Sequence, residues 1–248
     1  MIYPYPRLLI WDCDGVLIDN ECVARRAMQK LHKELWNVDL SDDQFRKLYL
    51  GHAEVEGREI IAKTFNVVVP PDFSDLKTAL RMKEWKEKPR PTPGISELIQ
   101  AWPNKQCIAS GSTLDLLKFS LNMPAVDLWN LFGGHIFSST QKEVKKGKPA
   151  PDVFLYAARQ MNVHPSACLV IEDSLSGVKA AKAAGMRVYG LISGEHCTPE
   201  HGQKLLETGA DKVFRNAYEL AAYLNLPVRY PLTSFRRTPL IQTYTPRR

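Results

Sequence analysis

Two aspartates separated by one residue follow the first apolar run of the chain. Residues 7–11 have the composition of a buried strand and lead directly into Asp12-Cys13-Asp14-Gly15. Because side chains alternate along an extended backbone, Asp12 and Asp14 would point to the same side at the carboxyl end of that strand. Two carboxylates this close repel each other, and a bound divalent cation relieves the repulsion. Such pairs are often only solvated carboxylates in a loop. The prediction of a metal site therefore requires a second acidic site.

Glu172 and Asp173 supply that second acidic site. They follow another apolar run, residues 168–171, and precede Ser174, which opens a predicted helix. Ligands of open α/β sheets gather at the carboxyl ends of the strands. Carboxylates at two strand ends that lie far apart in the sequence are therefore what a shared metal site requires.

A hydroxyl group and a lysine would complete a site for phosphoryl transfer. Ser110 ends a third apolar run and is followed by Gly111, so a hydroxyl and free backbone N–H groups could meet phosphate oxygens at a helix entry. Lys148 precedes another predicted helix and could neutralise a transferring phosphoryl group and its nucleophile. Each feature alone is ordinary, because Ser-Gly-Ser is common in turns and Lys148 belongs to a lysine-rich loop.

The elements that must position these residues follow from the hydrophobic pattern. Short apolar runs alternate with longer segments of helical period, which indicates parallel strands joined by crossover helices. The predicted strands cover residues 7–11, 106–110, 135–138, 168–171, 187–192 and 212–214, and helices are predicted after Gly94, after Thr113, at 149–161 and at 174–184. The predicted fold class is α/β, with a doubly wound, Rossmann-like parallel sheet as its core.

The alternation is interrupted between the first two predicted strands. From about residue 21 to about residue 89 no strand is convincing, and Leu31 and Leu35 recur at helical spacing. The proline-rich residues 89–94 cannot continue a helix. We therefore predict a Rossmann-like catalytic core at residues 1–20 and 90–228, with a small α-helical cap domain at residues 21–89 inserted after strand 1.

Composition excludes several other classes. The net charge of +6 comes mainly from residues 229–248, which hold five arginines and no acidic residue, so we predict a basic, loosely ordered tail there and not a nucleic-acid surface. The five cysteines lack any C-x-x-C spacing, which favours buried reduced thiols over zinc binding. No apolar stretch is long enough to span a membrane, so we expect a cytoplasmic protein, as a monomer or weak dimer.

Taken in order, four segments resemble the four motifs of the haloacid dehalogenase-like superfamily: DCDGVLID, CIASGS, GKPAPDVF and LVIEDSLSGVKAAKAAGM. The resemblance covers almost the whole chain up to about residue 225, and the motifs together are highly specific. The helical insert after the first motif is similar to the cap of the subgroup that includes β-phosphoglucomutase and sugar-phosphate phosphatases.

The resemblance implies a magnesium-dependent phosphatase. Asp12 would attack phosphorus to form an aspartyl phosphate, while Asp14 would protonate the leaving oxygen and later activate water. Mg²⁺ would be held by a carboxylate oxygen of Asp12, the backbone carbonyl of Asp14 and the carboxylate of Asp173. Glu172 would either bind the metal directly or orient the metal ligands without touching the metal.

The resemblance also implies how a small phosphorylated metabolite, such as a sugar phosphate, would bind. Ser110, Gly111 and Lys148 would meet the phosphoryl oxygens. A cap loop at Gly51 and His52 would face the rest of the substrate. These positions complete the expected site.

Two alternatives remain open at this point. β-Phosphoglucomutases carry a histidine where this chain has Ala24 and an arginine where it has Glu54, which favours a phosphatase over a mutase. The other alternative is a non-catalytic binding protein on the same scaffold, with the arginine-rich tail on an acidic partner. Against it, all the expected catalytic positions hold chemically competent residues.

Overall fold

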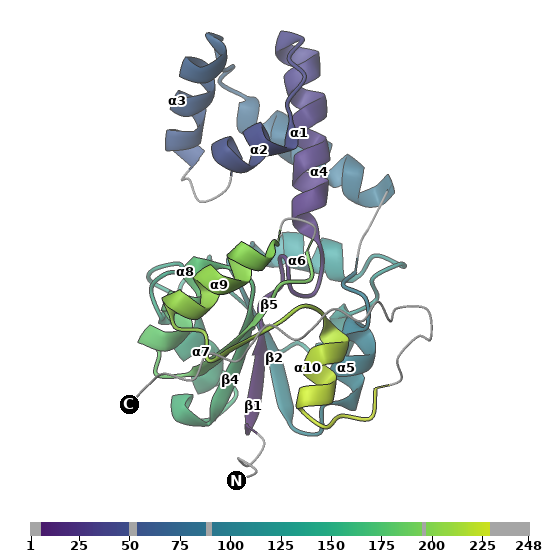
Figure 1. Ribbon diagram of the computed structural model, residues 1–248, viewed down its shortest axis with the longest axis vertical. Coiled ribbons are helices and arrows are strands. Elements are labelled where there is room, and N and C mark those ends of the chain that lie inside the picture. Colours follow the sequence, from purple (N-terminus) through teal and green to yellow (C-terminus); the bar gives the residue numbers. More distant parts are fainter. Residues whose placement is uncertain (1–5, 50–53, 88–90, 195–196, 229–248) are drawn as a thin grey trace. The chain divides into compact units, whose positions relative to one another are not determined.

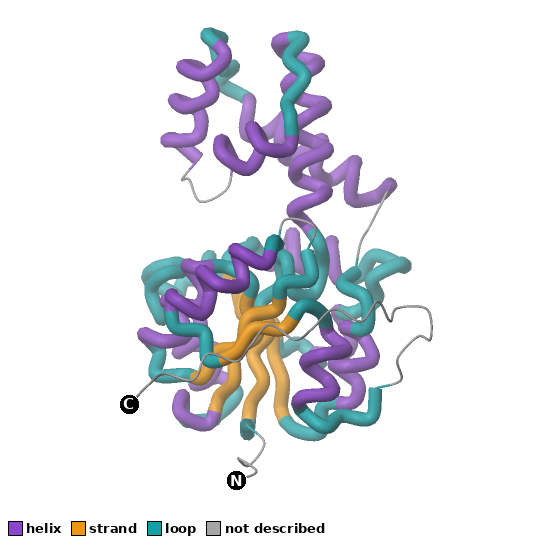
Figure 2. Tube along the Cα trace, in the orientation of Figure 1, coloured by secondary structure: helices purple, strands orange, loops and turns teal. Residues whose placement is uncertain are grey.

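The computed structural model describes residues 6–49, 54–87, 91–194 and 197–228. The chain divides into two compact units, one formed by Asn20–Pro89 and the other by the segments before and after it (Figure 1). Strands occur in the second of these units, and the described part of Asn20–Pro89 is helical (Figure 2). Among the described residues, no helix is both long and apolar enough to cross a membrane.

Within the described residues, six parallel strands form one sheet. They are β1 (Leu8–Trp11), β2 (Lys105–Ser110), β3 (Ile136–Ser138), β4 (Cys168–Glu172), β5 (Arg187–Leu191) and β6 (Lys212–Phe214), in the order β3-β2-β1-β4-β5-β6. The predicted α/β class and doubly wound sheet are confirmed, and each predicted strand matches its observed bounds to within one residue at either end. The winding reverses between β1 and β4, so ligands are expected at the carboxyl ends of these two strands.

Helices cover both faces of the sheet. On one face lie α7 (Asp152–Gln160), α8 (Leu175–Ala183) and α9 (Pro199–Thr208), and on the other lie α5 (Ile95–Ala101) and α10 (Ala217–Tyr223) (Figure 1). A further helix, α6 (Leu114–Leu121), follows β2. The predicted helix at 149–161 begins later, at Asp152, and α9 and α10 were not predicted.

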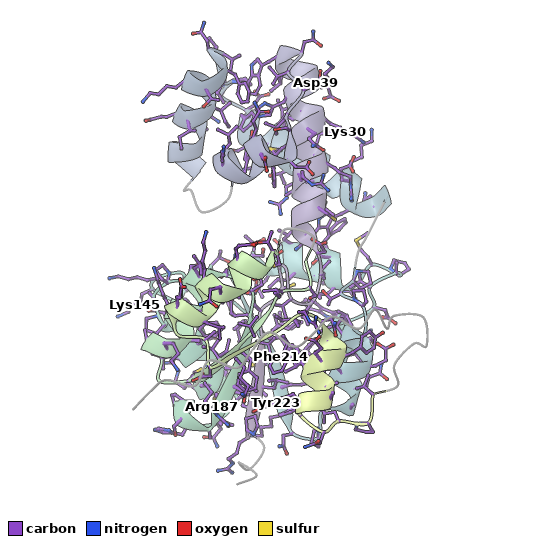
Figure 3. All side chains as sticks on the ribbon, in the orientation of Figure 1. Lys30, Asp39, Lys145, Arg187, Phe214 and Tyr223 are labelled. Carbon is purple, nitrogen blue, oxygen red and sulfur yellow. The ribbon has the colours of Figure 1, made fainter. Side chains whose placement is uncertain are left out.

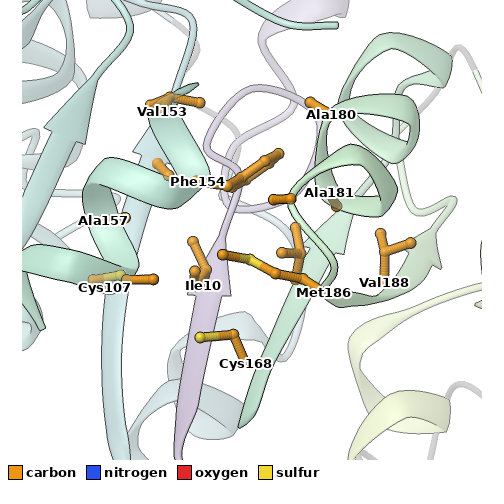
Figure 4. Close-up of a cluster of buried hydrophobic side chains, with 14 of the residues drawn as sticks. Ile10, Cys107, Val153, Phe154, Ala157, Cys168, Ala180, Ala181, Met186 and Val188 are labelled. Carbon is orange, nitrogen blue, oxygen red and sulfur yellow. The ribbon is translucent and has the colours of Figure 1, made fainter. Parts of the chain in front are cut away.

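The main core lies between the sheet and helices α7 and α8. Ile10 and Val188 project from the strands toward Phe154 on α7 and Ala181 on α8 (Figure 4). At the alternate positions of β1, Leu9 and Trp11 point to the opposite face and are equally buried. Burial on both faces explains why β1 reads as a continuous apolar run, and it anchors the strand that leads to Asp12.

The unit Asn20–Pro89 consists of α1 (Asn20–Trp36), α2 (Asp42–Tyr49), α3 (Glu54–Phe65) and α4 (Phe73–Glu87). Its core includes Met28, Leu31, Phe45, Ile61 and Phe73. The buried carboxylate of Glu84 on α4 accepts a hydrogen bond of 3.0 Å from Arg26 Nε on α1. It also contacts Lys30 on α1, which is labelled in Figure 3. These partly exposed ion pairs link the two longest helices of the unit.

Among the described residues of this helical unit, His32 is a histidine that lies in the core. His32 is fully buried, its ring packs edge-to-face on Trp36 and Phe65, and its Nε2 lies 2.5 Å from the Tyr49 hydroxyl. Its Nδ1 meets no hydrogen-bonding group among the described residues. Burial lowers the pKa of His32 to about 4, because protonation would place a charge and an unpaired N–H in an aromatic environment.

We predict that acid destabilises the helical unit through His32. Below its usual pKa of 6.5 the unfolded chain binds a proton at His32, whereas the folded unit stays neutral there down to about pH 4. The free energy of unfolding should therefore decrease as the pH is lowered from 6.5 to about 4, by up to about 3 kcal/mol from this group. Urea unfolding followed by far-ultraviolet circular dichroism at several pH values measures the effect.

The control is a double variant, His32→Phe with Tyr49→Phe, which removes the titrating ring and the hydroxyl that pairs with it. Other carboxylates still titrate in this variant, so the difference between the two proteins isolates His32. The wild type should lose more stability than the variant between pH 6.5 and 4. Equal pH slopes for the two proteins would contradict the assignment.

Candidate active site

Asp12 and Asp14 stand where β1 ends and the chain turns. The Asp12 N–H donates to the Ile171 carbonyl at 2.9 Å, which continues the pairing of β1 with β4. Gly15 then adopts a φ of 87°, which glycine tolerates best. A Cβ at Gly15 would lie 1.8 Å from Oδ2 of Asp173. The loop after β1 can therefore approach the end of β4 only because residue 15 has no side chain.

Three buried carboxylates meet at this point. Asp12, Glu172 and Asp173 each offer an oxygen, and these atoms lie within 4.8 Å of one another. Burial raises the pKa of Asp12 well above its usual range; Lys148 opposes this shift, whereas the nearby acidic groups add to it. A cluster of oxygen donors with this excess of negative charge fits a hard divalent cation such as Mg²⁺.

Lys148 places a positive charge inside the carboxylate cluster. It lies in the loop before α7, and its Nζ donates to Asp12 Oδ1 at 2.5 Å, to Glu172 Oε1 at 2.6 Å and to the Ala109 carbonyl at 3.2 Å. Burial alone would lower the pKa of Lys148, but the two carboxylates raise it above its usual value. The ammonium is therefore charged and fully hydrogen-bonded.

Glu172 has few acceptor positions left. Its Oε2 accepts from the backbone N–H groups of Asp173 and Ser174 at 2.9 Å each and from the Ser174 hydroxyl at 3.0 Å, while Oε1 accepts from Lys148. These donors lie at the start of α8, where the helix dipole favours a negative charge. The carboxylate of Glu172 thus fixes Lys148 and the start of α8 together.

Two serines at the end of β2 hold Asp14. The Ser112 hydroxyl lies 2.7 Å from Asp14 Oδ2 and the Ser110 hydroxyl 3.3 Å from the same oxygen. The Ser112 carbonyl in turn accepts from the Ser138 hydroxyl of β3 at 2.6 Å. The carboxylate of Asp14 is therefore oriented by β2 and β3, whereas Asp12 is oriented by β4 and Lys148.

The structure brings together most of the residues that the sequence indicated. Asp12, Asp14, Glu172, Asp173, Ser110 and Lys148 all lie at the carboxyl edge of the sheet, and Gly111 stands between the two serines that face Asp14. Gly51 and His52 lie outside the described residues, and the side chain of Glu54 is also not described.

Two further residues of the site were missed from the sequence. Ser112 could have been found, since it lies two residues after Ser110, a spacing that can return a side chain to the same face. His201 could not, because α9 was not predicted. Its Nε2 lies 2.5 Å from the backbone carbonyl oxygen of Asp173.

The doubly wound sheet, the buried acidic cluster at the ends of β1 and β4 and the lysine beside it agree with the hydrolase family whose motifs the sequence resembles. The chain belongs to the haloacid dehalogenase-like hydrolase family, whose sequence model matches residues 6–185.

Similar proteins include a phosphorylated carbohydrates phosphatase of Thermotoga maritima, which is 29% identical over 82% of this chain and 91% of its own length. Two solved structures have the same fold. One is a haloacid dehalogenase family hydrolase of Deinococcus radiodurans with bound phosphate and sodium (TM-score 0.77, 28% identity, 89% and 95% of the two chains). The other is a putative β-phosphoglucomutase of Thermotoga maritima (TM-score 0.72, 26% identity, 88% and 98%).

We predict that Gly177→Ala disrupts the site although it lies in a helix. A Cβ at Gly177 would lie 1.7 Å from Glu172 Oε1, so the carboxylate must move away from Lys148. Alanine usually stabilises a helix by about 0.5–1 kcal/mol relative to glycine. Here the clash should reverse that sign and cost about 1–3 kcal/mol, measured as a shift in thermal unfolding.

Lys179→Ala is the matched control, because Lys179 lies on the same helix and is exposed. Its unfolding temperature should stay close to that of the wild type. A Gly177→Ala protein more stable than the wild type would show that Glu172 is free to shift without loss.

Proposed function

We propose that this protein is a phosphoric monoester hydrolase that acts on a small phosphorylated metabolite, in particular a sugar phosphate. The observation that carries the proposal is the buried contact of Lys148 with Asp12. An anionic nucleophile and an anionic phosphoryl group repel each other, and a fixed ammonium beside the nucleophile offsets that repulsion. Family membership and the similarity to a phosphorylated carbohydrates phosphatase support the substrate class.

In the proposed mechanism the carboxylate of Asp12 attacks phosphorus, and the bond from phosphorus to the leaving oxygen breaks. Asp14 donates a proton to that oxygen, so the product leaves as an alcohol. Asp14, now ionised, then takes a proton from a water molecule that attacks the aspartyl phosphate. This second step releases inorganic phosphate and restores Asp12.

The surrounding residues would bind and orient the reacting groups. Ser110 and the backbone around Gly111 would meet the phosphoryl oxygens, and Lys148 would do so by exchanging one of its three present hydrogen bonds. The Ser112 hydroxyl would hold Asp14 in place. Asp12, the Asp14 carbonyl and Asp173 would hold Mg²⁺. Glu172 would not bind the metal itself, because its oxygens already accept four hydrogen bonds. Bound Mg²⁺ would supply charge neutralisation at the phosphoryl group.

We predict that Asp12→Asn abolishes turnover and leaves the fold intact. The amide has nearly the same shape, and Lys148 keeps its contact with Glu172, but the nucleophile is lost. Steady-state hydrolysis of 4-nitrophenyl phosphate with Mg²⁺ should fall by several orders of magnitude, with an unchanged circular dichroism spectrum.

Retention of a tenth of the activity by Asp12→Asn would remove Asp12 from this role. A wild-type protein with no turnover on any phosphorylated metabolite, but with salt-dependent binding to nucleic acid that requires residues 229–248, would favour the non-catalytic alternative.

A mutase is the second candidate function, and the structural similarity to a putative β-phosphoglucomutase favours it. Ala24, on α1, stands where the resemblance to mutases leads one to expect histidine, so the sequence shows no group there to favour a sugar hydroxyl over water. We therefore predict that phosphate accumulates in step with the consumption of a sugar monophosphate. A bisphosphate primer should not accelerate the reaction.

The measurement incubates the protein with β-glucose 1-phosphate and β-glucose 1,6-bisphosphate, and it follows glucose 6-phosphate and free phosphate together. Rapid isomerisation with little release of phosphate would make the mutase the better assignment.

A further inference from the structure

The site contains a histidine contact that the proposed mechanism does not use. His201 lies on α9, and its Nε2 is 2.5 Å from the backbone carbonyl oxygen of Asp173, the residue between β4 and α8. A carbonyl oxygen can only accept a hydrogen bond, so Nε2 carries the proton in this contact. The imidazole therefore donates to the main chain of a predicted metal ligand.

Helix α9 holds His201 in a fixed place. Thr198 caps the helix, and its hydroxyl oxygen accepts the His201 N–H at 3.2 Å. The next residue is Gly202, where a Cβ would lie 3.1 Å from Ile192 and 3.3 Å from Val213. The helix thus packs closely on the β5 and β6 side of the sheet, and this packing fixes the backbone position from which the imidazole of His201 extends.

The contact completes the restraint of Asp173. The N–H of Asp173 donates to Glu172 Oε2 at 2.9 Å, and its carbonyl accepts from His201. Both peptide groups that flank its Cα are therefore fixed, and its carboxylate points to the side where Gly15 leaves room. Rotation of either peptide group would turn the carboxylate away from Asp12.

We propose that His201 is a positioning residue that raises the affinity of the site for a divalent cation by holding the backbone of Asp173. This inference rests on the proposed function, in which Asp173 is a metal ligand. His201 touches neither the substrate nor the metal in this scheme. Groups that orient metal ligands in this way typically change metal affinity by about 10–100-fold when they are removed.

The test measures Mn²⁺ binding to the full chain by the electron paramagnetic resonance signal of free Mn²⁺. His201→Phe removes the donor and keeps an aromatic ring, and His201→Gln keeps an N–H at a similar reach. We expect His201→Phe to weaken binding by about tenfold or more and His201→Gln to stay within about threefold of the wild type. Lys204→Ala, exposed on the same helix, is the control and should bind as the wild type does.

A second readout separates positioning from general damage. With a generic phosphate ester, His201→Phe should raise the Mg²⁺ concentration for half-maximal activity while kcat at saturating Mg²⁺ changes little. Wild-type Mn²⁺ affinity in His201→Phe, or equal weakening in His201→Phe and His201→Gln, would overturn the inference.

Asp173→Asn distinguishes a failure of this inference from a failure of the proposed function. Loss of Mn²⁺ binding in Asp173→Asn with wild-type binding in His201→Phe overturns the role of His201 alone. A wild-type protein that binds no Mn²⁺ overturns both the metal site and the role of His201.

Discussion

The contact of Lys148 with Asp12 and Glu172 is the interaction on which the site depends. A buried ammonium without a counter-ion, or two buried carboxylates without a cation, would each be strongly destabilising. The three groups come from segments that follow or end β1, β3 and β4, so their distances of 2.5 and 2.6 Å require those strands to keep their places in the sheet. The parallel register of Trp11 opposite Ile171 sets the first of these relations. A shift of one residue would turn Asp12 to the other face.

The charges in this cluster do not balance. Asp12, Glu172 and Asp173 together carry more negative charge than Lys148 supplies, and Asp14 stands beside them. Proteins tolerate such an imbalance mainly where it serves a ligand, because the folded state is less stable for it. The serines that orient Asp14 and the helix start that holds Glu172 distribute the carboxylates among different donors. A divalent cation is the partner that would offset the remainder.

The sequence predicted the strands of the fold more completely than it predicted the contacts within the candidate site. β1 and β4 could be located because strands buried on both faces read as unbroken apolar runs, and their carboxyl ends necessarily meet at one edge. The pairing of Glu172 with Lys148 could not be read from the sequence, since it depends on distances between loops. Helix α9 was missed for a local reason. It contains Gly202, which weakens the helical pattern and which packs closely against Ile192 and Val213.

Glycine recurs where the charged groups approach the backbone. Gly15 leaves space for Asp173 and Gly177 leaves space for Glu172, and in both cases an added Cβ would overlap the carboxylate. A carboxylate that packs against a glycine Cα has fewer positions open to it than one that faces solvent, so less conformational freedom remains to be lost when a ligand binds. Gly202 differs, because it faces the apolar side chains of Ile192 and Val213, and it lets the helix that carries His201 pack closely on the sheet. The site is thus ordered by close packing of main chain as well as by its hydrogen bonds, and changes at Gly15 and Gly177 should act on the chemistry through the carboxylates they accommodate.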